Sequence, residues 1–106
     1  MRGRSRRSEA LALLGIAQRA GAVVKGTDAT RRALKKGLIR LVVFAEDGSE
    51  TQRRKVLPLA RAHGIPWESL GSMNELGGAL GAGSLSTVGV TERRFAGEIR
   101  KRLGRD

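Results

Sequence analysis

The side chains that could perform acid–base or nucleophilic chemistry are few and lie far apart in the sequence. His63 is the only histidine, and it directly precedes Gly64 at the end of a predicted helix. A cation or hydrogen-bond donor suits the free carbonyls at such a position. No serine stands in a recognisable motif with a general base. We therefore interpret His63 as structural and expect no catalytic residues.

The acidic and glycine-rich segments do not form a convincing metal or cofactor site. Glu46 and Asp47 follow a predicted buried strand, where α/β enzymes often place catalytic acids. No partner acid or metal-ligand spacing accompanies them, so we expect Asp47 and Ser49 to organise the turn into the next helix. The glycine-rich run 78–83 follows a helix instead of a strand, unlike a phosphate-binding loop. The absence of cysteine excludes thiol chemistry and cysteine-ligated zinc. We expect neither metal nor cofactor.

Basic side chains, in contrast, are concentrated between residues 25 and 40. This segment contains six Lys or Arg residues and the single acid Asp28. A helix that begins after Gly26 would present free backbone N–H groups to a phosphate, and glycine would let a nucleic-acid backbone approach closely. The turn Lys25–Asp28, together with Arg32, is therefore predicted to anchor RNA. A solvated basic helix is the alternative.

The net charge of the chain also favours a polyanionic partner. Lys and Arg number 21 against 10 Asp and Glu, which gives a formal charge of +11. Nucleic acid is the usual partner of such a protein; an anionic membrane surface and solubility alone are the alternatives. Phe44, Trp67 and Phe95 lie in or beside apolar runs, so we expect them in the core and not in a base-stacking platform.

We expect the 106 residues to form one domain preceded by a short arm. Residues 1–7 are basic and are predicted to be disordered, and residues 8–106 are predicted to be a single RNA-binding domain. The apolar stretch Ala10–Ala17 lacks a signal-peptide cleavage pattern, and no run reaches the roughly 18 apolar residues that a membrane span needs. We therefore predict a cytoplasmic protein with no membrane partner.

Hydrophobic periodicity predicts that helices and strands alternate along the chain. The expected helices cover residues 8–20, 26–36, 49–63, 72–80 and 92–103, and the expected strands cover 22–25, 39–45, 65–70 and 85–91. The predicted helix N-caps are Ser8, Thr27, Ser49 and Ser72, the last two in capping boxes with Gln52 and Glu75. The apolar run Leu41–Ala45 should be buried on both faces of a sheet. This order predicts an α/β fold in which a sheet lies between helical layers.

The segment Lys25–Asp47, KGTDATRRALKKGLIRLVVFAED, resembles the ribosomal protein L7Ae family, which also includes the L30e proteins and small bacterial paralogues. The similarity extends to Leu57–Leu59, to Gly64–Pro66, and to Glu75–Gly77 with Ala79 and Gly81, and it covers nearly all of Ser8–Thr91. The order and spacing of these segments carry the resemblance. It implies a three-layer α-β-α sandwich whose four-stranded mixed sheet has helices on both faces.

The resemblance also implies non-catalytic binding to kink-turn RNA, an internal loop with tandem sheared G·A pairs and a sharply bent backbone. In such proteins the turn before the second helix enters the bent groove, and a loop before the last strand closes over a flipped-out base. Carried over by position, with the outward-facing Lys36 added, the predicted RNA-binding residues are Lys25, Gly26, Thr27, Asp28, Ala29, Arg32, Lys36, Ala82, Gly83, Ser84 and Leu85.

Two positions depart from the kink-turn readers of this family, which usually have Asn and Glu where this chain has Asp28 and Ala29. An ionised Asp only accepts hydrogen bonds, whereas an amide also donates them, and the Ala side chain does neither. We therefore expect recognition mainly through phosphates and RNA shape. Either weaker kink-turn affinity or a different RNA feature would follow.

Taken together, the sequence predicts a monomeric, ribosome-associated RNA-binding protein with no small-molecule substrate. One alternative is a subunit that recruits substrate RNA to an RNA-modifying enzyme, because domains of similar fold precede RNA methyltransferase modules. The other is a non-specific nucleic-acid compaction protein that binds through its basic ends, Arg2–Arg7 and Arg93–Arg105.

Overall fold

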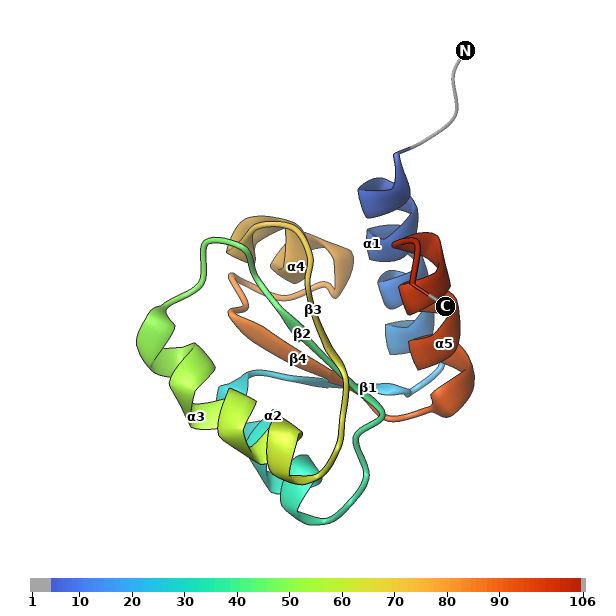
Figure 1. Ribbon diagram of the computed structural model, residues 1–106. Coiled ribbons are helices and arrows are strands. Elements are labelled where there is room, and N and C mark those ends of the chain that lie inside the picture. The colour runs from blue at the N-terminus through green and yellow to red at the C-terminus, as the bar shows by residue number, and fades with distance from the viewer. Residues whose placement is uncertain (1–4, 106) are drawn as a thin grey trace.

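Helices and strands alternate throughout residues 5–105, the part of the chain that the computed structural model describes (Figure 1). The helices are α1 (Arg6–Arg19), α2 (Thr27–Lys35), α3 (Glu50–Ala62), α4 (Met73–Ala79) and α5 (Arg93–Arg102). The strands are β1 (Val23–Lys25), β2 (Leu41–Phe44), β3 (Trp67–Ser69) and β4 (Thr87–Val90). All nine predicted elements are present within these residues, and the strands are shorter than predicted.

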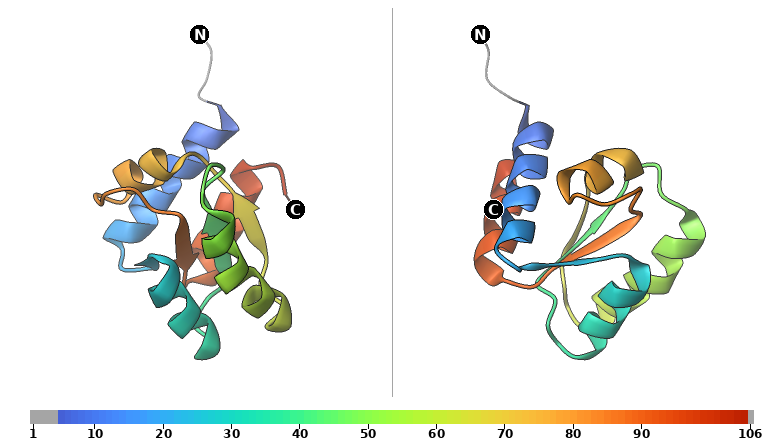
Figure 2. Two further views of the ribbon diagram at one scale, coloured as in Figure 1. Left: turned by 90° about the vertical axis from the view of Figure 1, so that its left-hand side faces the viewer. Right: turned by 180° about the vertical axis from the view of Figure 1, so that it is seen from behind.

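The four strands form one mixed sheet in the order β1-β4-β2-β3. Strand β4 is antiparallel to both β1 and β2, and β2 is parallel to β3. Helices α1, α4 and α5 cover one face, and α2 and α3 cover the other (Figures 1 and 2). The predicted three-layer sandwich is therefore confirmed. No helix among residues 5–105 is long and apolar enough to cross a bilayer.

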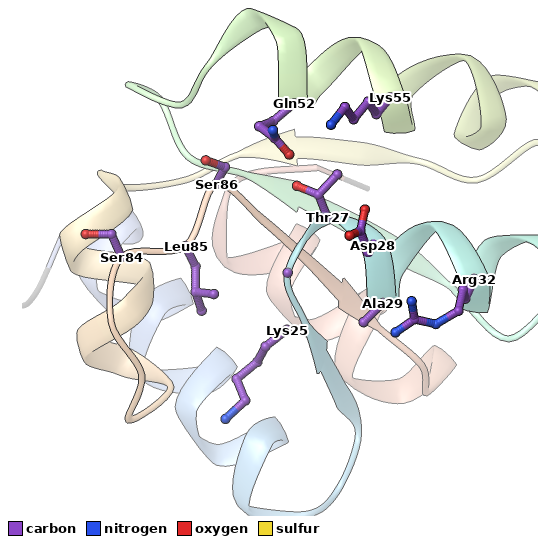
Figure 3. Close-up of a pocket in the computed structure, with 11 residues that line it drawn as sticks. Lys25, Thr27, Asp28, Ala29, Arg32, Gln52, Lys55, Ser84, Leu85 and Ser86 are labelled. Atoms are coloured by element: carbon purple, nitrogen blue, oxygen red, sulfur yellow. The ribbon is translucent and has the colours of Figure 1, made fainter.

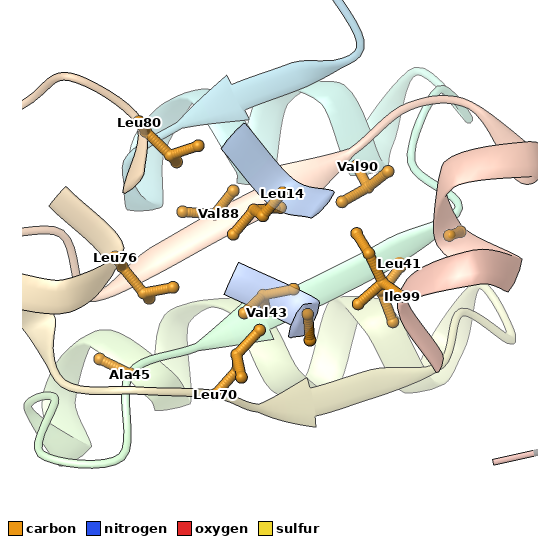
Figure 4. Close-up of a cluster of buried hydrophobic side chains, with 12 residues drawn as sticks. Leu14, Leu41, Val43, Ala45, Leu70, Leu76, Leu80, Val88, Val90 and Ile99 are labelled. Atoms are coloured by element: carbon orange, nitrogen blue, oxygen red, sulfur yellow. The ribbon is translucent and has the colours of Figure 1, made fainter. Parts of the chain in front are cut away.

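Strand β2 supplies the centre of two hydrophobic clusters, one on each face of the sheet. Leu41 and Val43 pack among residues from α1, α4 and α5 (Figure 4), whereas Val42 and Phe44 pack against α2 and α3. All four side chains are almost completely buried, and burying each one contributes roughly 1.5–3 kcal/mol. This confirms the prediction that the run is buried on both faces. Trp67 and Phe95, which were predicted to lie in the core, are only partly buried and pack against the clusters.

Residues 1–7 were predicted to be a disordered arm. For residues 5–7, which the structure describes, this prediction is wrong. Ser5 caps α1 by accepting a hydrogen bond from the backbone N–H of Ser8 at 3.0 Å, so Ser8 lies in the first turn and is not the cap. Arg7 donates to Glu75 at 2.6 Å and to Glu46 at 3.3 Å, which ties the start of α1 to α4 and to the segment after β2. Residues 1–4 lie outside the described residues.

Two of the other predicted helix caps are confirmed, and one is wrong. Ser49 caps α3, and Ser72 with Glu75 forms a complete capping box at α4. Asp47 does not organise the turn into α3; its carboxylate accepts the Met73 N–H at 2.7 Å and so braces α4 instead. The N-cap of α2 is Gly26 and not Thr27, whose hydroxyl donates to the Thr87 hydroxyl of β4 at 3.3 Å.

Candidate nucleic-acid interface

The turn between β1 and α2 leaves a group of backbone donors free. Gly26 donates its N–H to the Thr87 carbonyl at 2.9 Å, and the first helical bond runs from the Thr30 N–H to the Gly26 carbonyl. The N–H groups of residues 27–29 therefore have no helical acceptor, and no side chain caps them. They lie at the positive end of the α2 dipole, which favours an anion.

The conformation of this turn depends on glycine. Gly26 has φ 99° and ψ 158°, a combination that is essentially restricted to glycine and costs other residues about 1–3 kcal/mol. This backbone places Lys25 in the last position of β1 and Thr27 in the first turn of α2. Glycine at residue 26 is therefore a geometric requirement of the turn, in addition to allowing a ligand to approach closely.

The free N–H groups border a pocket of about 490 Å³, which we call the α2 pocket (Figure 3). Three parts of the chain meet here: the β1–α2 turn with the first half of α2, the first half of α3, and the segment before β4. The lining residues are Lys25, Gly26, Thr27, Asp28, Ala29, Arg32, Gln52, Lys55, Ser84, Leu85 and Ser86.

Eight of the eleven predicted site residues line the α2 pocket, and three do not. Lys36 is the C-cap of α2, and the nine helical residues that precede it span about 13 Å, which places it at the far end from the pocket. Ala82 and Gly83 are exposed in the loop before β4 but do not reach the pocket wall. Their segment is nevertheless continuous with Ser84 and Leu85, which do.

The contribution of α3 to the pocket was not predicted from the sequence. Gln52 and Lys55 are three residues apart, and so share one face of that helix. Helix α3 packs beside α2 on the same face of the sheet, which brings this pair to the edge of the pocket (Figure 3). No local signal distinguishes Lys55 from the other basic residues of α3. The third missed residue, Ser86, directly follows the predicted segment.

The segment before β4 is held against α4 by several hydrogen bonds. The backbone N–H of Ala82 donates to the Gly77 carbonyl at 2.8 Å, and that of Leu85 donates to the Met73 carbonyl at 3.1 Å. The Ser84 hydroxyl donates to the side-chain carbonyl of Asn74 at 2.7 Å. Gly77 allows this close approach, because a Cβ at residue 77 would collide with the carbonyl oxygen of Gly83. Helix α4 therefore positions one wall of the pocket.

The charges in the α2 pocket are unbalanced. Three cationic side chains, those of Lys25, Arg32 and Lys55, share it with the single carboxylate of Asp28. Within residues 5–105 none of these four groups forms an ion pair. Their positive charge is therefore available to an external anion. His, Asp and Glu side chains do not gather in groups of three that could hold a metal anywhere in the described residues.

Residues 8–98 match the Ribosomal protein L7Ae/L30e/S12e/Gadd45 family. The chain belongs to this family. The match spans both walls of the α2 pocket and confirms the resemblance inferred from the segment Lys25–Asp47.

Two curated proteins are similar to this chain over most of its length. The RNA-binding protein YlxQ of Bacillus subtilis is 31% identical over 87 residues, which cover 82% of this chain and 87% of YlxQ. The large ribosomal subunit protein eL8 of Haloquadratum walsbyi is 38% identical over 74 residues, which cover 69% of this chain and 62% of eL8. These names describe RNA-binding and ribosomal proteins and do not describe enzymes.

Solved structures show the same L7Ae-type fold. A protein of unknown function from Bacillus halodurans has a TM-score of 0.85 at 26% identity, covering 90% of this chain and 96% of its own. The 15.5kD RNA binding protein of Giardia lamblia has a TM-score of 0.76 at 23% identity, covering 96% of this chain and 88% of its own. At 23% identity, the similarity to the Giardia lamblia protein concerns the fold alone.

Proposed function

We propose that this L7Ae-family protein is a non-catalytic RNA-binding protein that holds phosphates of a sharply bent, kink-turn-like RNA in the α2 pocket. The observation that carries the proposal is the set of three free N–H groups at residues 27–29, surrounded by unpaired cationic side chains. Backbone donors at a helix N-terminus and flanking Lys or Arg side chains are a common phosphate-binding arrangement. The name of YlxQ, an RNA-binding protein of similar length, supports the same partner.

The shape of the α2 pocket favours a bent strand over a straight duplex. Its volume of about 490 Å³ lies in the range that encloses a small ligand, and its walls come from both sides of the β1–α2 turn (Figure 3). Leu85 adds an apolar surface to the charged groups that line the pocket. A flipped-out nucleotide with its neighbouring phosphates would meet both kinds of surface.

Asp28 limits which groups of an RNA the site can recognise. Its carboxylate is exposed at the start of α2 and can accept hydrogen bonds but not donate them. Phosphates and the bend of the RNA then supply most of the recognition, and base edges supply less. The proposal further includes a monomeric protein that acts in the cytoplasm in association with the ribosome, with residues 8–106 as its RNA-binding domain.

Fluorescence anisotropy with two RNA hairpins tests the proposal. One hairpin carries a kink-turn, and in the other the tandem G·A pairs are replaced by Watson–Crick pairs so that the helix is straight. We expect tighter binding to the kinked hairpin, and several-fold weaker binding by Lys25→Gln and Arg32→Gln, because each removes a cationic side chain from the pocket. Equal affinity for both hairpins would contradict shape recognition. Failure to bind either RNA would contradict the function itself.

A further inference from the structure

A second pocket, of about 330 Å³, lies at the other end of the sheet from the α2 pocket. The backbone shows the separation: Thr87, at the start of β4, accepts the Gly26 N–H, whereas Val90, at its end, accepts the Arg40 N–H at 2.7 Å. Three residue steps along a strand cover about 10 Å. The second pocket is therefore a separate place on the surface, and no residue lines both pockets.

Three arginines converge on this second pocket, which we call the arginine pocket. Arg40 precedes β2, whereas Arg93 and Arg100 both come from α5. The two α5 residues are seven positions apart, about two helical turns, and so lie on one face of the helix. Gly97 lies between them, and a Cβ at this position would meet no other atom within 4 Å. The space between the α5 arginines is therefore left open.

The positive charge of the arginine pocket is only partly neutralised within the protein. Arg100 contacts the buried carboxylate of Glu68 at 3.4 Å, but Arg105 shares that carboxylate at 3.1 Å. Arg40 and Arg93 have no carboxylate partner among residues 5–105, and no acidic residue lines the pocket. Like charges that converge in this way repel one another unless an anion lies between them.

We propose that the arginine pocket binds a phosphate group of the same RNA that occupies the α2 pocket, so that the protein contacts its RNA at both ends of the sheet. This inference rests on the proposed function. Planar guanidinium groups match phosphate oxygens and bind them through paired hydrogen bonds. A helical nucleic-acid strand carries one phosphate for about every 3.4 Å of its axis. An RNA that continues a few nucleotides beyond the α2 pocket therefore offers phosphates at the required distance.

The test compares two double variants that lose the same charge. Arg40→Gln with Arg93→Gln removes the two unpaired arginines, which are exposed. Arg94→Gln with Lys101→Gln removes two exposed charges from α5 that do not line the pocket. Arg100 is left intact because its loss would weaken the pairing of the buried Glu68 carboxylate. Circular dichroism melting should show that both double variants fold like the parent.

Binding is measured by anisotropy at 50 and 200 mM salt with a kink-turn RNA that extends ten nucleotides beyond the kink on each side. When a protein neutralises one phosphate fewer of a duplex, the slope of log affinity against log salt becomes shallower by about 0.9. The affinity advantage of the parent over Arg40→Gln/Arg93→Gln should then shrink about 3.5-fold between the two salt concentrations. The control variant should retain a slope closer to that of the parent. An equal change in both variants would overturn the proposal, because net charge alone would explain it.

Two further comparisons distinguish failure of this proposal from failure of the proposed function, and RNA binding from binding of a free anion. If Lys25→Gln/Arg32→Gln weakens RNA binding and Arg40→Gln/Arg93→Gln does not, only the arginine pocket is rejected. If the parent binds no RNA, the proposed function is rejected as well. In amide NMR spectra, RNA should shift the signals of Ile65 and Gly97 in the parent but not in Arg40→Gln/Arg93→Gln. Shifts with inorganic phosphate and none with RNA would overturn the proposal in favour of a free anion.

Discussion

At the scale of single residues, Lys36 and Lys55 show how the structure changes the assignment of the site. Lys36 belongs to the predicted basic segment but lies at the far end of α2, whereas Lys55 comes from another helix and lines the α2 pocket. We expect Lys55→Gln to weaken RNA binding several-fold and to lower the salt slope by about 0.9, the value for one phosphate contact. Lys36→Gln should have a smaller effect on both the RNA affinity and the salt slope. Anisotropy titrations of the two variants over a salt series make the comparison.

If Lys36→Gln had the larger effect, the RNA would run along the outside of α2 instead of into the pocket. The two variants have the same charge and both replaced lysines are exposed, so non-specific attraction to RNA is matched between them.

Asp28 gives a second prediction at the residue scale. Asp28→Asn removes the only carboxylate from the α2 pocket and adds a donor that can bind a base edge. We expect affinity for the kink-turn hairpin to rise by about 5- to 150-fold, because one good base contact is worth about 1–3 kcal/mol. Both Asp28→Asn and the control Asp28→Ala lose the favourable interaction with the α2 dipole, which is worth about 0.3–1 kcal/mol of stability. Isothermal titration calorimetry measures the affinities.

An Asn variant that binds no more tightly than the Ala variant would show that charge alone matters at this position. Base-edge hydrogen bonding would then have no part in the recognition.

At the scale of secondary-structure elements, α4 acts as the support for the segment before β4. Gly77→Ala would place a methyl group against the Gly83 carbonyl, and such overpacking typically costs about 1–3 kcal/mol. We expect a lower melting temperature and weaker RNA binding, because Ser84 and Leu85 would move with the displaced segment. Gly78→Ala is the control: its Cβ would meet open space, and alanine favours the helix by about 0.8–1 kcal/mol.

Circular dichroism melting and anisotropy should therefore separate these neighbouring glycines. Unchanged RNA affinity in a folded Gly77→Ala protein would mean that the position of this segment does not matter for binding.

The turn that begins α2 shows the same dependence of an element on distant partners. The sequence around Gly26 predicts a helix start correctly, but it also favours Thr27 as the cap. In the structure the Thr27 hydroxyl donates a hydrogen bond to the hydroxyl of Thr87, sixty residues away in sequence, because β1 and β4 are neighbours in the sheet. The backbone N–H groups that Thr27 would have helped to satisfy are thus left free for a ligand.

At the scale of the whole molecule, the charge of +11 predicts strong dependence on salt. If RNA binding neutralises about six phosphates, affinity should fall about a thousandfold between 50 and 200 mM salt. Anisotropy titrations of the parent protein with the kink-turn hairpin at several salt concentrations measure this slope. A nearly flat response would contradict recognition through phosphates and would favour base and apolar contacts instead.

The sequence by itself determined the order of the elements, the burial of β2 on both faces and the concentration of basic residues before β2. These properties depend on residues close together in the chain: apolar periodicity, side-chain caps and the backbone freedom of glycine. The same local signals located the β1–α2 turn, which is half of the α2 pocket.

Only the tertiary structure decided which side chains meet. Arg7 contacts Glu46 and Glu75 because the start of α1 lies beside α4, and Lys55 reaches the α2 pocket because α3 packs beside α2. Arg40 meets Arg93 because β2 and β4 are antiparallel neighbours. Such contacts join residues that are tens of positions apart. The order in which strands pair sets them, and no short segment of sequence encodes that order.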